Sequence, residues 1–405
     1  MDSTRRERAT LALAVWGVLV SQVLLYPGVS DLVTALGGGR GEYDLSAGML
    51  FLVAEFASFV AFSSVWGALS DALGRRTWLI VAGALGGAAS YVALLALATL
   101  PWLDATFGAV LAVRLVGGAM TIGAFSLSIT MLADLSGGNG RNMGAAGIAI
   151  GLGAALGSVV GGQLTTIDPL APLYASAASL TAVALLVTTV TDRTPDSTRV
   201  GVGVVLKKLA ARPAFAVPYA FGFIDRMTAG FFALVGVYYF REAFGVDAAV
   251  AGGVLALFFV PFALLQYPLG SLSDRVGRFV PVVAGSVLYG VSIVAVGVAP
   301  AFELAAGLMV VVGVFGALVA PATMALVTDL ADSGERGAAL GGFNVFGSLG
   351  FLAGFLIGGV VADVVGYLPS FLVVGFAEVA IAVVALRAVK RLDGIDASQT
   401  PSSAD

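Results

Sequence analysis

Apolar stretches as long as a membrane-spanning helix recur along the whole of this sequence. A helix needs about 20 consecutive apolar residues to cross the ~30 Å hydrocarbon layer of a bilayer. Of the 405 residues, 59% are hydrophobic and only 11% are charged, with a mean hydropathy of +1.00, whereas soluble domains carry roughly 25% charged residues. The sequence therefore predicts an all-α, polytopic membrane protein and argues against a water-soluble fold.

Charges, prolines and glycines divide the apolar part of the chain into twelve predicted spans. They cover residues 9–30, 46–70, 77–98, 103–133, 143–165, 170–190, 214–240, 247–271, 279–299, 302–328, 336–361 and 367–388. The stretch 191–213 is the longest polar segment, carries five basic residues and is predicted to be a cytoplasmic linker. The predicted domains are thus a six-helix bundle over 1–190, a second over 214–391, and a polar tail over 392–405.

Lysine and arginine gather on every second connection between the predicted spans. Most of the 21 basic residues fall on the connections that share a side with the N-terminus, whereas only Arg40 and Arg241 occupy the others. Short cytoplasmic loops hold the excess of basic residues in multi-pass proteins. The distribution predicts a plasma-membrane protein with an even number of crossings and both termini in the cytoplasm.

Two motifs are each written twice in the chain. Gly67 to Arg76 reads GALSDALGRR and Gly270 to Phe279 reads GSLSDRVGRF. The second pair is GAALGSVVGG from Gly153 to Gly162 and GFLAGFLIGG from Gly350 to Gly359. In both pairs the copies lie about 200 residues apart, which is the arrangement expected of a transporter built from two parallel halves.

The first motif combines glycines, which permit a tight turn, with charges at the inner end of a helix. The carboxylate of Asp71 could pair with an arginine of the other half or lie at a helix N-terminus, where partial positive charge favours an anion. The alternative is an ordinary turn with basic anchors at the membrane surface. The predicted latch residues are Gly67, Asp71, Gly74, Arg75, Arg76, Gly270, Asp274, Arg275, Gly277 and Arg278.

These two loop motifs resemble the signature of the major facilitator superfamily, as do the basic linker and the string RLVGGAM at 114–120. The resemblance implies twelve transmembrane helices in two pseudo-symmetric six-helix bundles, with spans 1, 4, 7 and 10 around a central cavity. In the first copy Ala72 and Leu73 stand where the family often has a basic residue, so the first latch is expected to lack one contact.

The glycine-rich motif resembles the antiporter motif of the drug/H+ antiporter branch, although Ser158 replaces its usual proline. Glycines every four residues form one smooth helix face. We expect that face to pack against a helix of the other half, and generic glycine packing is the alternative. The predicted packing residues are Gly153, Gly157, Gly161, Gly162, Gly350, Gly354 and Gly358.

Ionisable side chains inside predicted spans mark possible functional sites, because each costs at least ~2.5 kcal/mol at bilayer depth. Glu55 and Arg114 lie at similar depth in spans 2 and 4 and are predicted to meet, either as a proton switch or as a static pair. In span 7, Asp225 is the predicted proton or cation site, with Arg226 as a structural partner, and mutual neutralisation is the alternative. The resemblance implies that Glu378, in span 12, lies away from the cavity.

Other polar side chains inside the spans are few, which suits amphipathic or lipophilic substrates better than sugars. The substrate-cavity candidates are Gln22, Tyr26, Arg226, Tyr238, Gln266 and Asn344. Cysteine and histidine are absent and no phosphate-binding loop occurs, so we expect no enzyme activity, cofactor, metal or nucleic-acid partner.

The sequence therefore predicts a monomeric, proton-coupled exporter of hydrophobic or amphipathic molecules that works by alternating access in the lipid bilayer. Proton coupling, rather than coupling to another cation, is what the family resemblance implies. Uptake or exchange of an organic anion, bound by Arg114 and Arg226, is the main alternative. A receptor or helper protein that keeps the fold without transport is a third.

Overall fold

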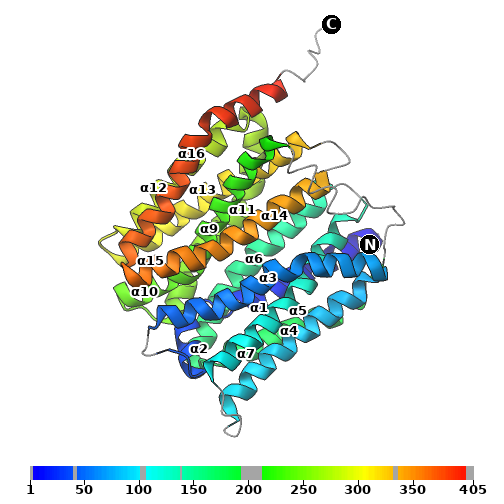
Figure 1. The fold of residues 1–405 in the computed structure, drawn as a ribbon, viewed down its shortest axis with the longest axis vertical. Helices are drawn as coiled ribbons and strands as arrows, with labels where there is room; N and C mark the ends of the chain where they lie inside the picture. The colour runs from blue at the N-terminus through cyan, green and yellow to red at the C-terminus, as the bar shows by residue number, and fades with distance from the viewer. Residues whose placement is uncertain are drawn as a thin grey trace. The chain divides into compact units, whose positions relative to one another are not determined.

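The computed structural model describes residues 3–39, 43–100, 106–136, 139–192, 212–331 and 336–397, and every regular element in these ranges is helical (Figure 1). Most of the predicted linker (193–211), the end of the polar tail (398–405) and Arg40 lie outside the described residues. The predicted all-α class is confirmed.

The described residues of the first half of the chain form seven helices. They are α1 (Ser3–Val23), α2 (Val29–Ala35), α3 (Leu45–Leu73), α4 (Arg76–Thr99), α5 (Phe107–Ala133), α6 (Asn139–Ile167) and α7 (Ala171–Val187). The second half begins with a short 3-10 turn, η1 (Pro213–Phe215), and contains two π-helical segments. Its elements are α9 (Ala216–Phe231), η2 (Phe232–Gly236), α10 (Val237–Phe244), α11 (Ala248–Val276), α12 (Phe279–Gly297), α13 (Phe302–Leu330), α14 (Arg336–Ala353), η3 (Gly354–Gly358), α15 (Gly359–Val364) and α16 (Tyr367–Ala397).

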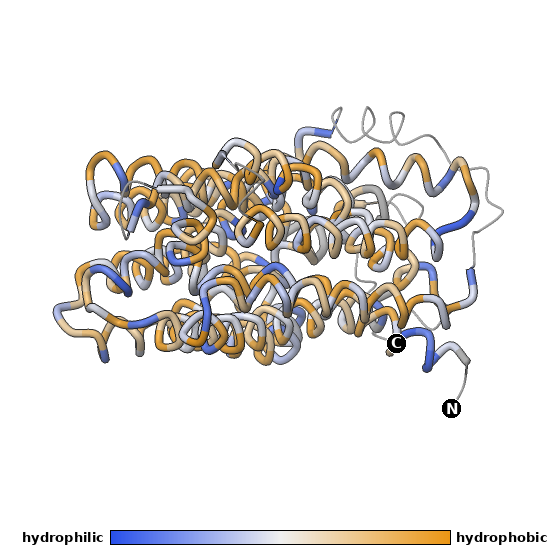
Figure 2. Tube along the Cα trace, turned by 90° about the horizontal axis from the view of Figure 1, so that it is seen from below, coloured by the Kyte–Doolittle hydropathy of each residue, from blue (hydrophilic) through white to orange (hydrophobic). Residues whose placement is uncertain are grey.

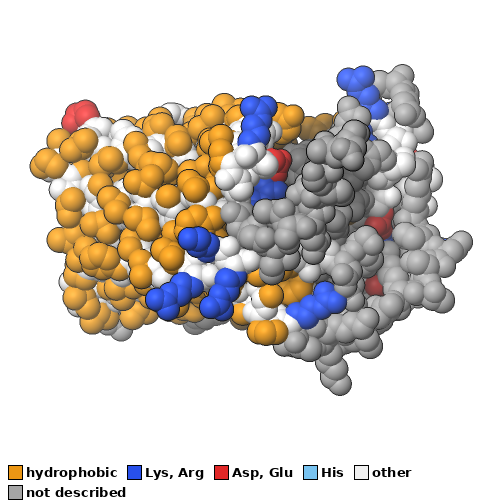
Figure 3. Space-filling view, turned by 90° about the horizontal axis from the view of Figure 1, so that it is seen from above, with side chains coloured by type: hydrophobic (Ala, Val, Ile, Leu, Met, Phe, Trp, Pro, Cys, Tyr) orange, Lys and Arg blue, Asp and Glu red, His pale blue; other side chains and the backbone are white. Residues whose placement is uncertain are grey.

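Ten helical stretches in the described part of the chain are long and apolar enough to cross a membrane. The helix α7 is apolar but has only 17 residues, and α1 begins with four charged residues among its first six. Apolar residues run along the helices (Figure 2), and apolar side chains cover most of the described surface of the face in Figure 3. The chain is therefore a multi-pass integral membrane protein, while the exact number of twelve crossings stays a prediction.

Two predicted spans are not continuous α-helices. The first ends at Val23, and the chain turns over Leu24–Gly28 before α2 begins, because Pro27 has no backbone N–H to donate. In the predicted span 214–240, π-helix interrupts the α-helix at η2. Such π segments are frequent at functional sites. The predicted polar tail is also helical at its start, since α16 continues to Ala397.

The chain packs as two compact units. Unit 1 comprises Met1–Asp196 with Phe232–Ala263, and unit 2 comprises Ser197–Phe231 with Leu264–Asp405. Unit 1 therefore contains the first sequence repeat together with η2, α10 and the first part of α11, which belong to the second repeat. The predicted six-helix bundles, 1–190 and 214–391, are bounded by the sequence repeat rather than by these units, and they stay a prediction.

The glycine face of α6 packs against α1, so the predicted partner, a helix of the other half, was wrong. A Cβ on Gly153 would lie 3.0 Å from the Trp16 carbonyl oxygen, one on Gly157 would lie 3.0 Å from Val23, and one on Gly161 would overlap the backbone of Leu24. The neighbouring residues of α6 are the ones that meet the second repeat: Gly162 contacts the backbone of α11 at Ala248, and Ser158 contacts it at Gly252.

The second copy of the glycine motif packs in the corresponding way within unit 2. A Cβ on Gly350 would overlap the carbonyl group of Phe223 in α9, and a Cβ on Gly354 would lie 2.6 Å from the amide nitrogen of Phe231. The carbonyl of Gly358 accepts a hydrogen bond from Ser370 Oγ at 2.7 Å. The motif therefore lets α6 pack closely against α1, and lets α14 with η3 pack closely against α9.

Candidate functional site

The first latch motif holds a buried arginine at the turn between α3 and α4. Gly74 ends α3 in the left-handed conformation, with φ of +62°. The side chain of Arg76 is fully buried, pairs with Asp134, donates to Ser70 Oγ at 3.2 Å and lies 3.8 Å from Asp71. The turn therefore links the ends of α3, α4 and α5.

The sequence raised the possibility that the Asp71 carboxylate lies at a helix N-terminus. The carboxylate that lies at the N-terminus of α4 is that of Asp192. Its two oxygens accept from the backbone N–H groups of Arg76 at 3.1 Å and Thr77 at 3.3 Å. This satisfies two donors that a helix start leaves without intrahelical partners. Neither Asp134 nor Asp192 was predicted to join this turn, because each lies far along the chain from the motif.

The second latch motif repeats this arrangement with a shift of one residue. Arg278 pairs with Asp274 and donates to Asp329 at 3.1 Å and to Ser273 Oγ at 3.0 Å. In the aligned motifs Arg278 corresponds to Arg75, yet Arg75 is exposed and Arg76 makes the equivalent contacts. Burial lowers the pKa of the Arg278 guanidinium, but its hydrogen bonds and charge interactions with the two aspartates raise that pKa above the usual arginine range.

The other latch residues differ in how closely they are packed. Gly277 has φ of +86° and forms the second turn, as Gly74 forms the first. A Cβ on Gly67 would meet nothing within 4 Å, and one on Gly270 would lie 3.4 Å from Pro321. Arg275 is exposed. The glycines at the turns are therefore required by backbone conformation, whereas Gly67 is not.

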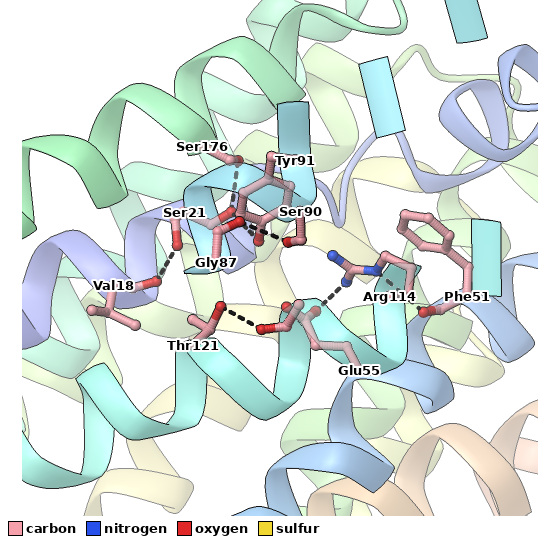
Figure 4. Close-up of polar contacts among 11 residues, drawn as sticks. Val18, Ser21, Phe51, Glu55, Gly87, Ser90, Tyr91, Arg114, Thr121 and Ser176 are labelled. Carbon is pink, nitrogen blue, oxygen red and sulfur yellow. Dashed lines mark hydrogen bonds and ion pairs between the residues drawn. The ribbon is translucent and has the colours of Figure 1, made fainter. Parts of the chain in front are cut away.

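Glu55 and Arg114 meet inside unit 1, as their similar depth predicted. Arg114 of α5 forms an ion pair with Glu55 of α3, and both side chains are at most 2% exposed (Figure 4). The guanidinium also lies 4.3 Å from the ring centroid of Phe51. Helices α3 and α5 approach closely here, since a Cβ on Gly118 would lie 2.9 Å from Glu55 Cα.

Hydroxyl groups from neighbouring helices surround this ion pair. The Tyr91 ring of α4 lies 5.9 Å from the Arg114 guanidinium, and its hydroxyl donates to the Ser21 carbonyl of α1 at 3.2 Å (Figure 4). Ser176 of α7 donates to the same carbonyl at 2.7 Å. Tyr26 is buried and interacts electrostatically with both members of the pair. Helices α1, α3, α4, α5 and α7 thus share one buried polar cluster.

A second buried polar cluster lies in unit 2. Asp225 of α9 is 4% exposed, and its Oδ1 atom makes no hydrogen bond with the described residues. Arg226 interacts electrostatically with Asp225, and its side chain runs along Gly347 of α14. Glu378 of α16 is fully buried and accepts from Thr228 Oγ1 of α9 at 3.1 Å. Glu378 therefore contacts the helix that carries Asp225, while its position away from the cavity stays a prediction.

Two glycines of α9 lie against a neighbouring helix. A Cβ on Gly222 would overlap the Phe343 ring, and one on Gly230 would overlap the carbonyl group of Phe351. Both glycines therefore make room for α14. The irregular segment is η2, which begins two residues after Gly230.

The substrate-cavity candidates lie in several environments. Gln22 and Tyr26 are buried in unit 1, and the hydroxyl of Tyr238 donates to the Asp44 carbonyl at 3.2 Å. Gln266 is half-buried and Asn344 is exposed. Two surface clefts, of about 440 and 220 Å³, lie beside the turn between α3 and α4 and the end of α7, and neither is lined by these candidates.

Helices that cross a membrane, duplicated charged turns and buried ion pairs define a membrane transporter rather than a soluble protein or a single-span receptor. A comparison with protein families identifies the family. The Major Facilitator Superfamily matches residues 11–239 and 219–403, nearly the whole length, so the chain belongs to this family of secondary transporters.

Curated relatives match part of the chain, among them the following two. An uncharacterized MFS-type transporter of Methanocaldococcus jannaschii is 30% identical over 164 residues, which are 38% of this chain and 42% of that protein. Multidrug resistance protein 1 of Bacillus subtilis is 28% identical over 135 residues, 33% of this chain and 35% of that protein. The matches thus span less than half the length of either relative.

Solved structures share the fold over the full length. A bacterial homolog of the human lysosomal transporter Spinster, in an inward-facing and unoccupied conformation, has a TM-score of 0.76 at 14% identity, with 100% of both chains covered. At this identity the likeness concerns the fold alone.

Proposed function

We propose that this transporter exports hydrophobic or amphipathic small molecules in exchange for protons. It works as a monomer in the plasma membrane, with both termini in the cytoplasm and with alternating access around a site between its two halves. The observation that carries the proposal is Asp225, a buried carboxyl group inside a predicted span with an oxygen that makes no hydrogen bond to the part of the chain that the structure describes. An ionised carboxylate is costly there, so this group is suited to taking up and releasing a proton.

Two observations support an amphipathic substrate over an organic anion. Arg114 is already neutralised by Glu55 and is 2% exposed, so it is poorly placed to bind an anion. Arg226 is adjacent to Asp225 and interacts with its charge. The resemblance of the glycine motif to the antiporter motif supports export, as does partial similarity to a protein named for multidrug resistance.

Flux measurements on purified protein in proteoliposomes test the proposal. An imposed pH gradient is expected to drive ethidium, an amphipathic cation, against its concentration gradient in vesicles with the protein but not in empty ones. Asp225→Asn is expected to abolish this coupled flux, whereas Glu303→Gln, at an exposed residue in the first turn of α13, is expected to retain it. Coupled flux that persists in the Asp225→Asn variant would exclude Asp225 as the proton carrier.

The alternatives give different outcomes in the same vesicles. Gradient-driven accumulation of labelled benzoate that depends on Arg226, without ethidium flux, would favour uptake or exchange of organic anions. A folded protein that moves neither compound would favour a receptor or helper role.

A further inference from the structure

The second polar cluster contains more negative than positive groups, which distinguishes it from the first. Glu55 and Arg114 balance each other as one acid and one base. In unit 2, by contrast, two acids, Asp225 and Glu378, share their surroundings with one base, Arg226. A buried region of low dielectric strongly disfavours an uncompensated charge.

Both acids have an oxygen atom that makes no hydrogen bond. Glu378 is fully buried and Asp225 is 4% exposed, and the atoms Glu378 Oε2 and Asp225 Oδ1 have no hydrogen-bond partner among the described residues. Buried polar atoms without partners are rare and call for an explanation. A proton on one of the two carboxyl groups lowers the cost of burying both, because it removes one negative charge from the cluster.

The groups that face the two acids come from α9 and α12. Thr228, one helical turn after Asp225 in α9, donates to Glu378 Oε1 at 3.1 Å and lies 3.5 Å from the Ile224 carbonyl oxygen. The Tyr289 hydroxyl of α12 reaches Thr228 and interacts electrostatically with both carboxyl groups. Among the described residues, Asp225, Arg226 and Tyr289 are the titratable groups found to interact with the cluster around Glu378.

The hydroxyl of Thr228 fits either protonation state of Glu378. A threonine hydroxyl can donate one hydrogen bond and accept two. With Glu378 ionised, Thr228 donates to it. With Glu378 protonated, Thr228 can accept from the acid and donate to the Ile224 carbonyl. The same contact therefore persists while the proton arrives and leaves.

Helices α12 and α16 pack closely beside the buried side chain of Glu378. A Cβ on Gly290 would lie 3.0 Å from the Cβ of Glu378, and one on Gly375 would lie 2.7 Å from the Gly290 carbonyl oxygen. In Figure 1 these two helices lie side by side.

We propose that Asp225 and Glu378 hold a single proton between them, with Thr228 and Tyr289 as its hydroxyl partners and Arg226 as the counter-charge. The shared proton adds to Asp225 a second proton-binding group, Glu378 on α16. The role of this proton in transport rests on the proposed function. Charge balance gives the count: two acids and one arginine are neutral when exactly one proton is bound.

Infrared difference spectra of the purified full chain, recorded as the pH is raised, test this without substrate or gradient. The wild type is expected to lose one protonated-carboxyl band, which shifts in D₂O. Glu378→Gln and Asp225→Asn are each expected to lack the band, because one acid and one arginine are then already balanced. Arg226→Gln is expected to double it. Glu303→Gln is the matched control and is expected to keep the wild-type band.

Several results would overturn the inference. These are an unchanged band in Glu378→Gln, a single band in Arg226→Gln, or loss of the band on adding sodium at constant pH, which would indicate a metal-cation site instead. If Glu378→Gln does not fold, Thr228→Val takes its place in the test. The pH midpoint at which the protonated-carboxyl band disappears is then compared with that of the wild type. A shifted midpoint supports the inference, and an unchanged midpoint rejects it. A normal band without ethidium flux would count against export only, whereas proton-coupled flux without the band would count against the shared proton only.

Discussion

Arg241, near the end of α10, makes two hydrogen bonds with the carboxylate of Asp31 in α2, at 2.5 and 3.1 Å, and a third with Ser30 Oγ at 2.6 Å. Its guanidinium also lies 5.4 Å from the Tyr43 ring centroid. The two charged residues come from different sequence repeats, yet both belong to unit 1. They therefore form a charged contact between the repeats. The sequence placed Arg241 only on a connection between spans and did not predict this contact.

Removing this contact should loosen the packing around α2. The chain has no cysteine, so a single cysteine at buried Val29 can report accessibility without background. We expect Arg241→Ala to raise the rate of maleimide labelling at that cysteine in purified protein, because the partly buried Asp31 loses its partner. The reciprocal exchange, Arg241→Asp with Asp31→Arg, should restore slow labelling. Exposed Arg387 provides the control substitution, and equal rates in all variants would contradict the prediction.

The latch arginines should differ in their contribution to stability. Arg76→Ala removes a fully buried guanidinium from Asp134, Asp71 and Ser70. Because the side chains of Asp134 and Asp71 are 34% and 39% exposed, the cost should be below the about 3–5 kcal/mol of breaking a fully buried pair. We expect a clear drop in the unfolding temperature of the detergent-purified protein. Arg75→Ala, at an exposed neighbour, should change it little. The opposite order would mean that the aligned residue Arg75, rather than Arg76, is the counterpart of Arg278.

The glycine face of α6 should not tolerate a methyl group. Gly161→Ala would place a Cβ against the Leu24 carbonyl, and overpacking of this kind costs typically 1–3 kcal/mol. Gly144 lies in the same helix with nothing within 4 Å of its Cβ position, so Gly144→Ala should be neutral or stabilising. Thermal unfolding of the two variants compares them directly. Equal stability would show that α6 and α1 are not closely packed at Gly161.

The Glu55–Arg114 pair should show strong coupling. Arg114→Met leaves a buried carboxylate without its counter-charge and should destabilise the protein by about 3–5 kcal/mol. Adding Glu55→Gln removes that charge as well, so the double variant should be more stable than Arg114→Met alone. A double-mutant cycle on unfolding free energies measures the coupling. Additive effects would show that the two side chains do not interact in the folded protein.

Transport separates a proton switch from a static pair at the same site. If Glu55 and Arg114 are a switch, Arg114→Ala should abolish proton-driven flux while membrane insertion stays intact. Retained proton-driven transport would make the pair structural. This readout is independent of the infrared band assigned to Asp225 and Glu378.

Much of this protein was predictable from the sequence because the solvent constrains it so strongly. A backbone in hydrocarbon must satisfy its own hydrogen bonds, so long apolar runs of about 20 residues predict membrane helices. The duplicated motifs predicted two related halves, and the similar packing of the equivalent residues Gly153 on α1 and Gly350 on α9 agrees with that repeat. Depth along two predicted helices was also enough to bring Glu55 and Arg114 together.

Only the tertiary structure decided which neighbours these residues have. The glycine face of α6 meets α1, Arg76 takes the position that alignment gives to Arg75, and Glu378 lies against the helix of Asp225. Asp134 and Asp192 join the latch from distant parts of the chain. The reason is physical: periodicity specifies which residues share a helix face, but the rotation of each helix and its partner result from the packing of all the helices together.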